Sequence, residues 1–201
     1  MKIVQMDQNN PDLDLIDEAT EVLTSGGVVL YPTDTVYGLG ANVFNEKAVE
    51  KVYNIKNRDY FKPLSVCVSS IDEILLIADV GNNKTHQILK NNLPGPFTFI
   101  FYKKEPIHNY ATKNHKVGIR IPENIISRKL TQSFPITTTS ANLSGKKTLN
   151  NPDEIINQLN EGIDFVIDVG RLKQSEPSTI VDLTRKEPKI LRKGSGILKS
   201  F

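Results

Sequence analysis

The side chains best suited to chemistry follow a short apolar run from Val28 to Tyr31, which predicts a buried strand. Pro32 ends this strand because proline cannot donate a hydrogen bond to a sheet ladder. Hydrogen-bonding side chains follow at once, together with two glycines that allow tight turns or close approach to a ligand: Thr33, Asp34, Thr35, Tyr37, Gly38 and Gly40. A binding loop and an ordinary polar loop between a strand and a helix both fit this composition.

Three cations follow the next predicted helix. Asn45 can cap that helix, whose apolar residues recur at three- and four-residue intervals as far as Lys56. Lys56, Arg58 and Lys62 then lead into a second strand at 64–68. A solvated run of charge is one interpretation. Because the cations leave a helix end and enter a strand, we expect them instead to lie beside the hydroxyl-rich loop and to bind anions.

Two later strands also carry polar groups. Arg120 has isoleucine on both sides, so it predicts either a structural ion pair or a ligand for a carboxylate, which guanidinium binds through two hydrogen bonds. Ser140 ends a run of three threonines at the carboxyl end of a strand, where open α/β sheets commonly bind ligands. No Gly-x-Ser-x-Gly elbow surrounds Ser140, so binding is favoured over nucleophilic attack. A hydroxyl-bearing strand face is the alternative.

Several kinds of site are excluded by spacing. The segment at 38–43 lacks the third glycine of a dinucleotide-binding loop, and the segment around 145–148 lacks the spacing of a P-loop. The histidines and the single cysteine, Cys67, show no metal-ligand spacing. We therefore expect no metal site, and we expect Cys67 to be a small buried hydrophobe.

Composition sets broader limits. A formal net charge of +2 is too small to indicate nucleic-acid binding unless the charge is concentrated on one surface. One cysteine cannot form an internal disulfide, and no apolar stretch is long enough for a signal peptide or a membrane span. These features predict a cytoplasmic protein. The length of 201 residues predicts one domain over residues 1–201 with a sizeable core.

Alternating helices and strands must position the polar segments. Helices are expected at 12–25, 45–56, 70–78, 82–91, 125–134 and from 151 onward. Strands are expected at 2–5, 28–31, 64–68, 97–102, 117–121, 136–139, 165–169, 179–183 and 189–191. The polar segment between the strands at 97–102 and 117–121, which holds His108 and His115, predicts a surface loop. This order of elements predicts an α/β domain with a mixed sheet.

The chain resembles the YrdC-like family of threonylcarbamoyl-AMP synthases over most of its length. The resemblance rests on PTDTVYGLG at 32–40, K-x-R at 56–58, K-P-L at 62–64, S-x-N at 140–142, P-S-T-I-V-D at 177–182 and R-x-G at 192–194. It implies a twisted open mixed sheet with flanking helices and a concave active site. Many longer members carry histidine where this chain has Cys67, so a ligand contact at that position is not carried over.

The resemblance implies a reaction that joins L-threonine, bicarbonate and ATP into L-threonylcarbamoyl-AMP and releases pyrophosphate. The threonine carboxylate, bicarbonate and the triphosphate are anions, so the site needs cations, and no enzyme nucleophile is required. By position, the threonine pocket is expected to contain Thr35, Arg120, Thr138 and Ser178. The expected nucleotide contacts are Arg58, Lys62, Ser140, Asn142, Thr148 and Arg192.

Lys56 and Arg58 are the expected catalytic cations. Lys56 and Asn142 would bind phosphate or bicarbonate, and removing either cation is expected to leave the fold nearly intact, because exposed or ligand-facing cations contribute little to stability. No tightly bound cofactor is implied. ATP is expected as a substrate, with Mg²⁺ accompanying its phosphates and without a protein ligand set for the metal.

The resemblance also implies partners. The chain ends nine residues after Arg192, as expected of the short form without the second domain of longer members. The product would pass to a threonylcarbamoyl-transferase complex, with tRNA as the final acceptor and at most a weak direct ligand, and no membrane is involved. Two alternatives are a YrdC-like RNA-binding or ribosome-maturation module and a paralogous carbamoyl-transfer enzyme. The complete set of S-x-N, Arg120 and P-S-T favours the synthase over both.

Overall fold

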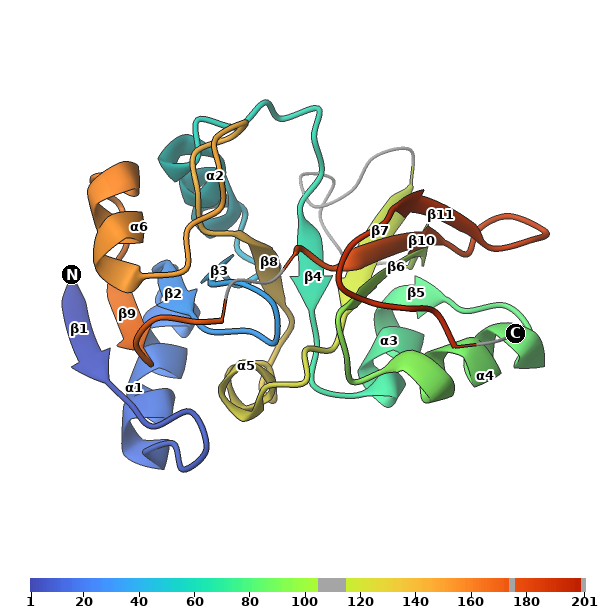
Figure 1. Ribbon diagram of the computed structural model, residues 1–201, viewed down its shortest axis with the longest axis horizontal. Coiled ribbons are helices and arrows are strands. Elements are labelled where there is room, and N and C mark those ends of the chain that lie inside the picture. The colour runs from blue at the N-terminus through green and yellow to red at the C-terminus, as the bar shows by residue number, and fades with distance from the viewer. Residues whose placement is uncertain (105–114, 174–175, 200–201) are drawn as a thin grey trace.

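The computed structural model describes residues 1–104, 115–173 and 176–199, and these form an open mixed α/β sheet with flanking helices (Figure 1). The predicted fold class is therefore confirmed. In chain order, the strands are β1 (Lys2–Gln5), β2 (Val29–Tyr31), β3 (Gly38–Gly40), β4 (Ser65–Cys67), β5 (Ala78–Asp79), β6 (Phe97–Lys103), β7 (Lys116–Arg120), β8 (Ile136–Ser140), β9 (Phe165–Asp168), β10 (Thr179–Asp182) and β11 (Lys189–Arg192).

The helices in the described residues all begin at a polar side chain that accepts a hydrogen bond from a backbone N–H of the first turn. This arrangement satisfies donors that have no partner inside the helix. The helices are α1 (Leu13–Thr24), α2 (Glu46–Ile55), α3 (Ile71–Ile77), α4 (Asn83–Asn92), α5 (Ile125–Leu130) and α6 (Pro152–Leu159). Their capping residues are Asp12, Asn45, Ser70, Asn82, Asn124 and Asn151. No helix of the described part is long and apolar enough to cross a membrane.

The strand order is β1-β9-β2-β3-β8-β4-β7-β6-β10-β11, and β5 pairs with β6. The sheet is mixed, because it contains both parallel pairs (β1 with β9, β2 with β9, β4 with β7, β6 with β10) and antiparallel pairs. Figure 1 shows β1 and the N-terminus at one end of the molecule, and β10, β11 and the C-terminus at the other. The central strands are therefore β3, β8, β4 and β7.

Helices cover both faces of the half of the sheet that contains β2. Val29 packs in a core cluster with α1 and α5, whereas Leu30 packs in a different cluster with α2 and α6. Successive residues of a strand point to opposite faces, so these two clusters lie on the two sides of the sheet. A third cluster joins α3 and α4 to β6 and β7 around Phe99. Apolar burial on this scale is the main force that holds the strands in register.

The structure corrects the prediction of a loop directly after Pro32, because β3 lies within that segment. Gly38 and Gly40 pair antiparallel with β2, and β3 also pairs with β8. Glycine is a poor strand former, so the sequence gives little sign of this strand. The missing side chains make room for Tyr31, whose ring atoms would lie 3.1 Å from a Cβ at Gly38 and 2.9 Å from one at Gly40.

Two smaller boundaries also differ from the predictions. Helix α5 ends at Leu130 and not at Phe134. Pro135 disfavours helical backbone at Phe134, so the helix could not have extended through that residue without cost. Ala78 belongs to β5, where it pairs with Lys103, instead of ending a helix. The predicted surface loop with His108 falls mainly on residues 105–114, outside the described residues.

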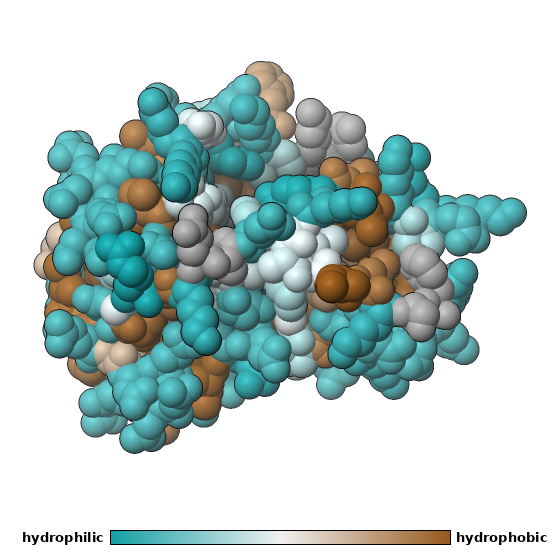
Figure 2. All heavy atoms as spheres, viewed as in Figure 1, coloured by the Kyte–Doolittle hydropathy of each residue, from teal (hydrophilic) through white to brown (hydrophobic). Residues whose placement is uncertain are grey.

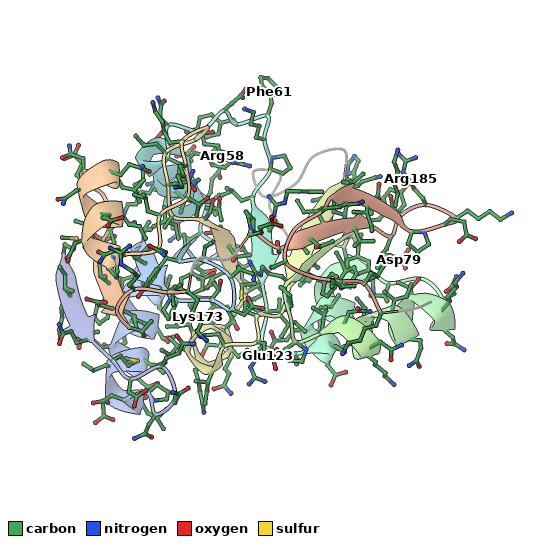
Figure 3. The ribbon with its side chains drawn as sticks, viewed as in Figure 1. Arg58, Phe61, Asp79, Glu123, Lys173 and Arg185 are labelled. Atoms are coloured by element: carbon green, nitrogen blue, oxygen red, sulfur yellow. The ribbon has the colours of Figure 1, made fainter. Side chains whose placement is uncertain are left out.

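Phe99 offers a test of the core. It is 0% exposed, whereas Phe61, at the apex of the segment between α2 and β4, is 80% exposed (Figure 3). Phe99→Ala is expected to lower the free energy of unfolding by about 3–5 kcal/mol, since it removes a buried ring and leaves a cavity. Phe61→Ala is expected to change it by less than about 0.5 kcal/mol. Urea denaturation of both variants provides the measurement, and equal losses would contradict this description of the core.

Candidate active site

A cavity of about 290 Å³ collects residues from strands β3, β4, β6, β7, β8, β10 and β11. Its lining contains many hydroxyl groups and three arginines, and no carboxylate lines it within the described residues. Most of the site residues predicted from the sequence are brought together here: Thr35, Arg58, Arg120, Thr138, Ser140, Thr148, Ser178 and Arg192. Lys56, Lys62 and Asn142 lie outside the lining.

A second cavity, of about 310 Å³ and more apolar, adjoins the first. The two share Pro63, Leu64, Ser65, Thr98 and Ile180. Leu191 also lines the second cavity and is 50% exposed. Figure 2 shows hydrophobic residues gathered over β10 and β11 on a face that is otherwise largely hydrophilic. The site therefore joins a polar, cationic part to an apolar part.

Strand register explains why these residues meet. Ser65 of β4 pairs with Thr138 of β8 on one side and with Gly118 of β7 on the other. On the far side of β7, the antiparallel pairing with β6 places Ile119 opposite Phe99. Residues that are distant in sequence thus become neighbours because their strands are neighbours.

Arg120 is 6% exposed and forms a buried ion pair with Asp34. The same Nη2 atom donates to Thr35 Oγ1 at 3.2 Å, and the second carboxylate oxygen of Asp34 accepts from the Glu123 backbone N–H at 3.1 Å. The sequence predicted either a structural ion pair or a carboxylate ligand for Arg120. The ion pair is present, and it uses only one edge of the guanidinium, so the other edge stays available for a ligand. Arg120 Nε is buried and has no partner within the described residues. A buried donor of this kind favours an acceptor ligand in the cavity.

Lys56 is 1% exposed, and its ammonium group is directed at backbone rather than at the cavity. Nζ donates to the carbonyl of Ser140 and, at 2.6 Å, to that of Asn142, while the Lys56 carbonyl accepts from Ser144 N at 2.8 Å. Lys56 therefore ties the end of α2 to the loop after β8. The expectation that its removal would leave the fold nearly intact is corrected, because the loss of a buried donor leaves two carbonyls unsatisfied.

Asn142 also stabilises the loop after β8 through its side-chain hydrogen bonds. Its side chain accepts from Ser140 Oγ at 2.5 Å and donates to the carbonyls of Leu143 and Lys146 at 2.8 and 2.9 Å. Lys62 is exposed, and its carbonyl accepts hydrogen bonds from Tyr53 and Arg58. The predicted ligand contacts of Lys56, Lys62 and Asn142 stay predictions.

Arg58 and Arg192 bring charge into the cavity from opposite sides of the site. Arg58 follows α2 (Figure 3) and donates to the carbonyls of Lys62 and Pro63 at 3.0 and 2.9 Å. Arg192, at the end of β11, donates to the Ser178 carbonyl through Nε and Nη2 at 3.1 and 2.7 Å. Burial lowers the pKa of both guanidinium groups, and the charge of Arg120 lowers the pKa of Arg192 further. An anion between them would relieve this cost.

The sequence predicted Asp34 only as one polar group of a possible binding loop and predicted no role for Thr98, although both support the site. Asp34 forms the ion pair that holds Arg120 in place, and the Thr98 hydroxyl forms a hydrogen bond with that of Ser178. Asp34 lies inside the P-T-D-T motif, which offered a signal. Thr98 lies within the apolar strand β6, where nothing in the sequence marks it.

Cys67 has no sign of a reactive role. Cys67 is fully buried, as predicted, and burial raises the pKa of its thiol to about 12, which keeps it protonated and inert. Among the described residues, no group of three His, Cys, Asp or Glu side chains is placed to hold a metal ion.

The protein is an α/β protein with an open mixed sheet, and arginine and hydroxyl side chains line the cavity beside its central strands. Residues 21–194 match the sequence model of the Sua5/YciO/YrdC family, described as "Telomere recombination". The chain belongs to this family, as the resemblance in its motifs predicts.

Similar proteins agree with this assignment. A putative threonylcarbamoyl-AMP synthase of Methanocaldococcus jannaschii is 44% identical over 88% of this chain and 83% of its own length. The crystal structure of Pyrococcus abyssi Sua5 complexed with L-threonine has a TM-score of 0.91 and 30% identity, and the match covers 96% of this chain but only 58% of that one. The Escherichia coli YciO structure also has a TM-score of 0.91, with 31% identity and 98% of that chain covered. Relatives named as synthases support an enzymatic role.

The burial of Lys56 generates a prediction about pH. Burial, and secondarily the charge of Arg58, lower its pKa from 10.5 to about 7. Between these values the unfolded chain binds a proton that the folded chain does not, so Lys56 makes the free energy of unfolding rise with pH. The difference between wild type and Lys56→Met should grow from pH 7.5 to 9, by at most about 1.4 kcal/mol per unit.

Urea denaturation at several pH values measures this difference. Lys51→Met is the matched control, because Lys51 is on the same helix and donates to the Gly26 carbonyl at 2.9 Å but is exposed. The difference in the free energy of unfolding between wild type and Lys51→Met should not change with pH. A flat difference for Lys56→Met as well would mean that Lys56 is charged throughout this range.

Proposed function

We propose that the protein is an L-threonylcarbamoyladenylate synthase, a nucleotidyltransferase that makes threonylcarbamoyl-AMP and pyrophosphate from L-threonine, bicarbonate and ATP. The observation that carries the proposal is the convergence of Arg58, Arg120 and Arg192 on a hydroxyl-rich cavity with no carboxylate in its described lining. Substrates with several negative charges are the ligands that such a cavity suits. Relatives named for this reaction, and one solved with L-threonine, support the choice.

The two parts of the site suit different parts of the substrates. Arg120, whose Nη2 donates to Thr35 and whose Nε has no partner among the described residues, fits the carboxylate of an amino acid. Arg58, Ser140, Thr148 and Arg192 fit the phosphates, and the adjoining apolar cavity offers space for the nucleoside.

The chemistry then needs positioning and charge neutralisation more than a reactive side chain. The threonine amine attacks bicarbonate and yields a carbamate, with loss of water. A carbamate oxygen attacks the α-phosphorus of ATP, and pyrophosphate leaves. Donors already fixed by Asp34 and by the carbonyls of Lys62, Pro63 and Ser178 need little reorganisation when charge moves.

ATP enters this scheme as a substrate, and Mg²⁺ is proposed to travel with its phosphates. The product is proposed to pass, in the cytoplasm, to a transferase complex that modifies tRNA. Pyrophosphate release measured with each substrate omitted in turn tests the core of the proposal. Release that needs all three substrates is expected, whereas release without an amino acid would indicate an ATPase.

Arg58→Ala should reduce pyrophosphate release by at least about 100-fold, because it removes a donor to developing negative charge. Arg185→Ala is the matched control, since Arg185 lies toward the far end of the β10–β11 hairpin, away from Arg58 (Figure 3). The control should keep its activity, and both variants should keep the thermal midpoint of the wild type within a few degrees. Unchanged turnover by Arg58→Ala would remove Arg58 from the proposed machinery.

Serine is the most informative substrate analogue. It keeps the carboxylate, amine and hydroxyl of threonine and lacks only one methyl group, which is worth about 1–3 kcal/mol in an apolar contact. The ratio of kcat/KM for threonine to that for serine should therefore lie at roughly 10–200. A ratio near one would show that the methyl group has no contact.

A further inference from the structure

Thr98 and Ser178 form a buried pair of hydroxyls in the wall of the cavity. Their Oγ atoms lie 2.8 Å apart, and the residues are 3% and 4% exposed. The pair is fixed by the parallel register of β6 and β10, in which Thr98 lies opposite Ile180, two residues after Ser178.

The hydrogen-bond capacity of this pair leaves one proton without a protein acceptor. Ser178 Oγ accepts from Arg192 Nη2 at 3.2 Å, and one hydroxyl donates to the other. Each hydroxyl carries one proton, so the second proton must find a different acceptor. No other acceptor for either hydroxyl occurs among the described residues, and both residues line the cavity. The remaining O–H is therefore available to a ligand, whichever hydroxyl carries it.

The same part of the cavity holds another unused donor. The antiparallel pairing of Phe99 with Ile119 places Thr98 next to Arg120 across the β6–β7 ladder. Arg120 Nε has no partner within the described residues. Two buried donors on neighbouring strands fit a ligand that only accepts, such as a carboxylate.

We propose that Thr98 is a positioning residue for the amino-acid carboxylate, acting through Ser178. The Thr98 hydroxyl forms a hydrogen bond with Ser178 Oγ, and Arg192 donates a second hydrogen bond to the same oxygen. The free proton of the pair is therefore directed into the cavity. This inference rests on the proposed function, since it names the amino acid as the ligand. It assigns a role to a residue that lies within a core strand and otherwise resembles a simple packing residue.

Isosteric variants separate the hydroxyl from the shape of the side chain. Thr98→Val removes only the hydroxyl, Thr98→Ser keeps it, and Thr131→Val is the matched control. Thr131 is also fully buried, and its hydroxyl bonds the carbonyls of Ser127 and Arg128 outside the cavity lining. Calorimetric titration with L-threonine, and separately with ATP, gives the dissociation constant of each variant for each ligand.

Thr98→Val should bind L-threonine about 10-fold more weakly than wild type, with an ATP affinity changed less than about twofold. Thr98→Ser should stay within about threefold for both ligands, and Thr131→Val should match wild type. If Thr98→Val does not fold, Thr98→Ala provides the same comparison. The decisive result is a loss of affinity for L-threonine alone, seen in Thr98→Val and absent in Thr98→Ser.

Three results would overturn the inference. Wild-type threonine affinity in Thr98→Val, an equal loss for ATP, or an equal loss in Thr98→Ser would each show that the hydroxyl does not position the carboxylate. Failure of the proposed function is distinguishable, because the wild-type protein itself would then show no threonine binding, and both conclusions would fall together.

Discussion

The burial of two basic side chains, Lys56 at the end of α2 and Arg120 at the end of β7, is the constraint on which this site depends. Lys56 and Arg120 are 1% and 6% exposed, and an isolated buried cation costs far more than a fold of this size can offset. Each cation is therefore satisfied by groups from a different segment. Lys56 bonds carbonyls of the loop after β8, and Arg120 bonds Asp34 and Thr35 of the loop after β2. The cations thus fix the loops that surround the cavity.

This constraint also prepares the cavity for anions. Arg120 and Arg192 are close enough for one charge to lower the pKa of the other, and burial acts in the same direction on Arg58. A bound anion removes part of that repulsion, so ligand binding and stability are linked. Because the donors are already oriented by backbone carbonyls and by Asp34, they lose little freedom when a ligand arrives. A site of this kind can catalyse a transfer reaction without a nucleophile.

Local sequence signals predicted most of the fold for identifiable reasons. Capping residues such as Asn45 and Asn151 marked helix starts, and apolar, β-branched runs such as the one ending at Tyr31 marked buried strands. The predictions failed where tertiary context outweighed propensity. β3 is a strand because Gly38 and Gly40 accommodate the Tyr31 ring between paired neighbours, and no local pattern records that ring.

The sequence by itself determined which chemical groups the site contains, because the family motifs placed Arg58, Arg120 and Arg192 among its residues before any contact was known. Only the tertiary structure decided how each group is used. Lys56 belongs to a motif, yet its ammonium group bonds backbone carbonyls, while Thr98 belongs to no recognised motif and bonds Ser178 in the cavity wall. The physical reason is that side-chain direction and hydrogen-bond partners depend on strand register. Register depends on how the apolar faces of strands far apart in the chain pack together, and the residues of one segment do not determine this by themselves.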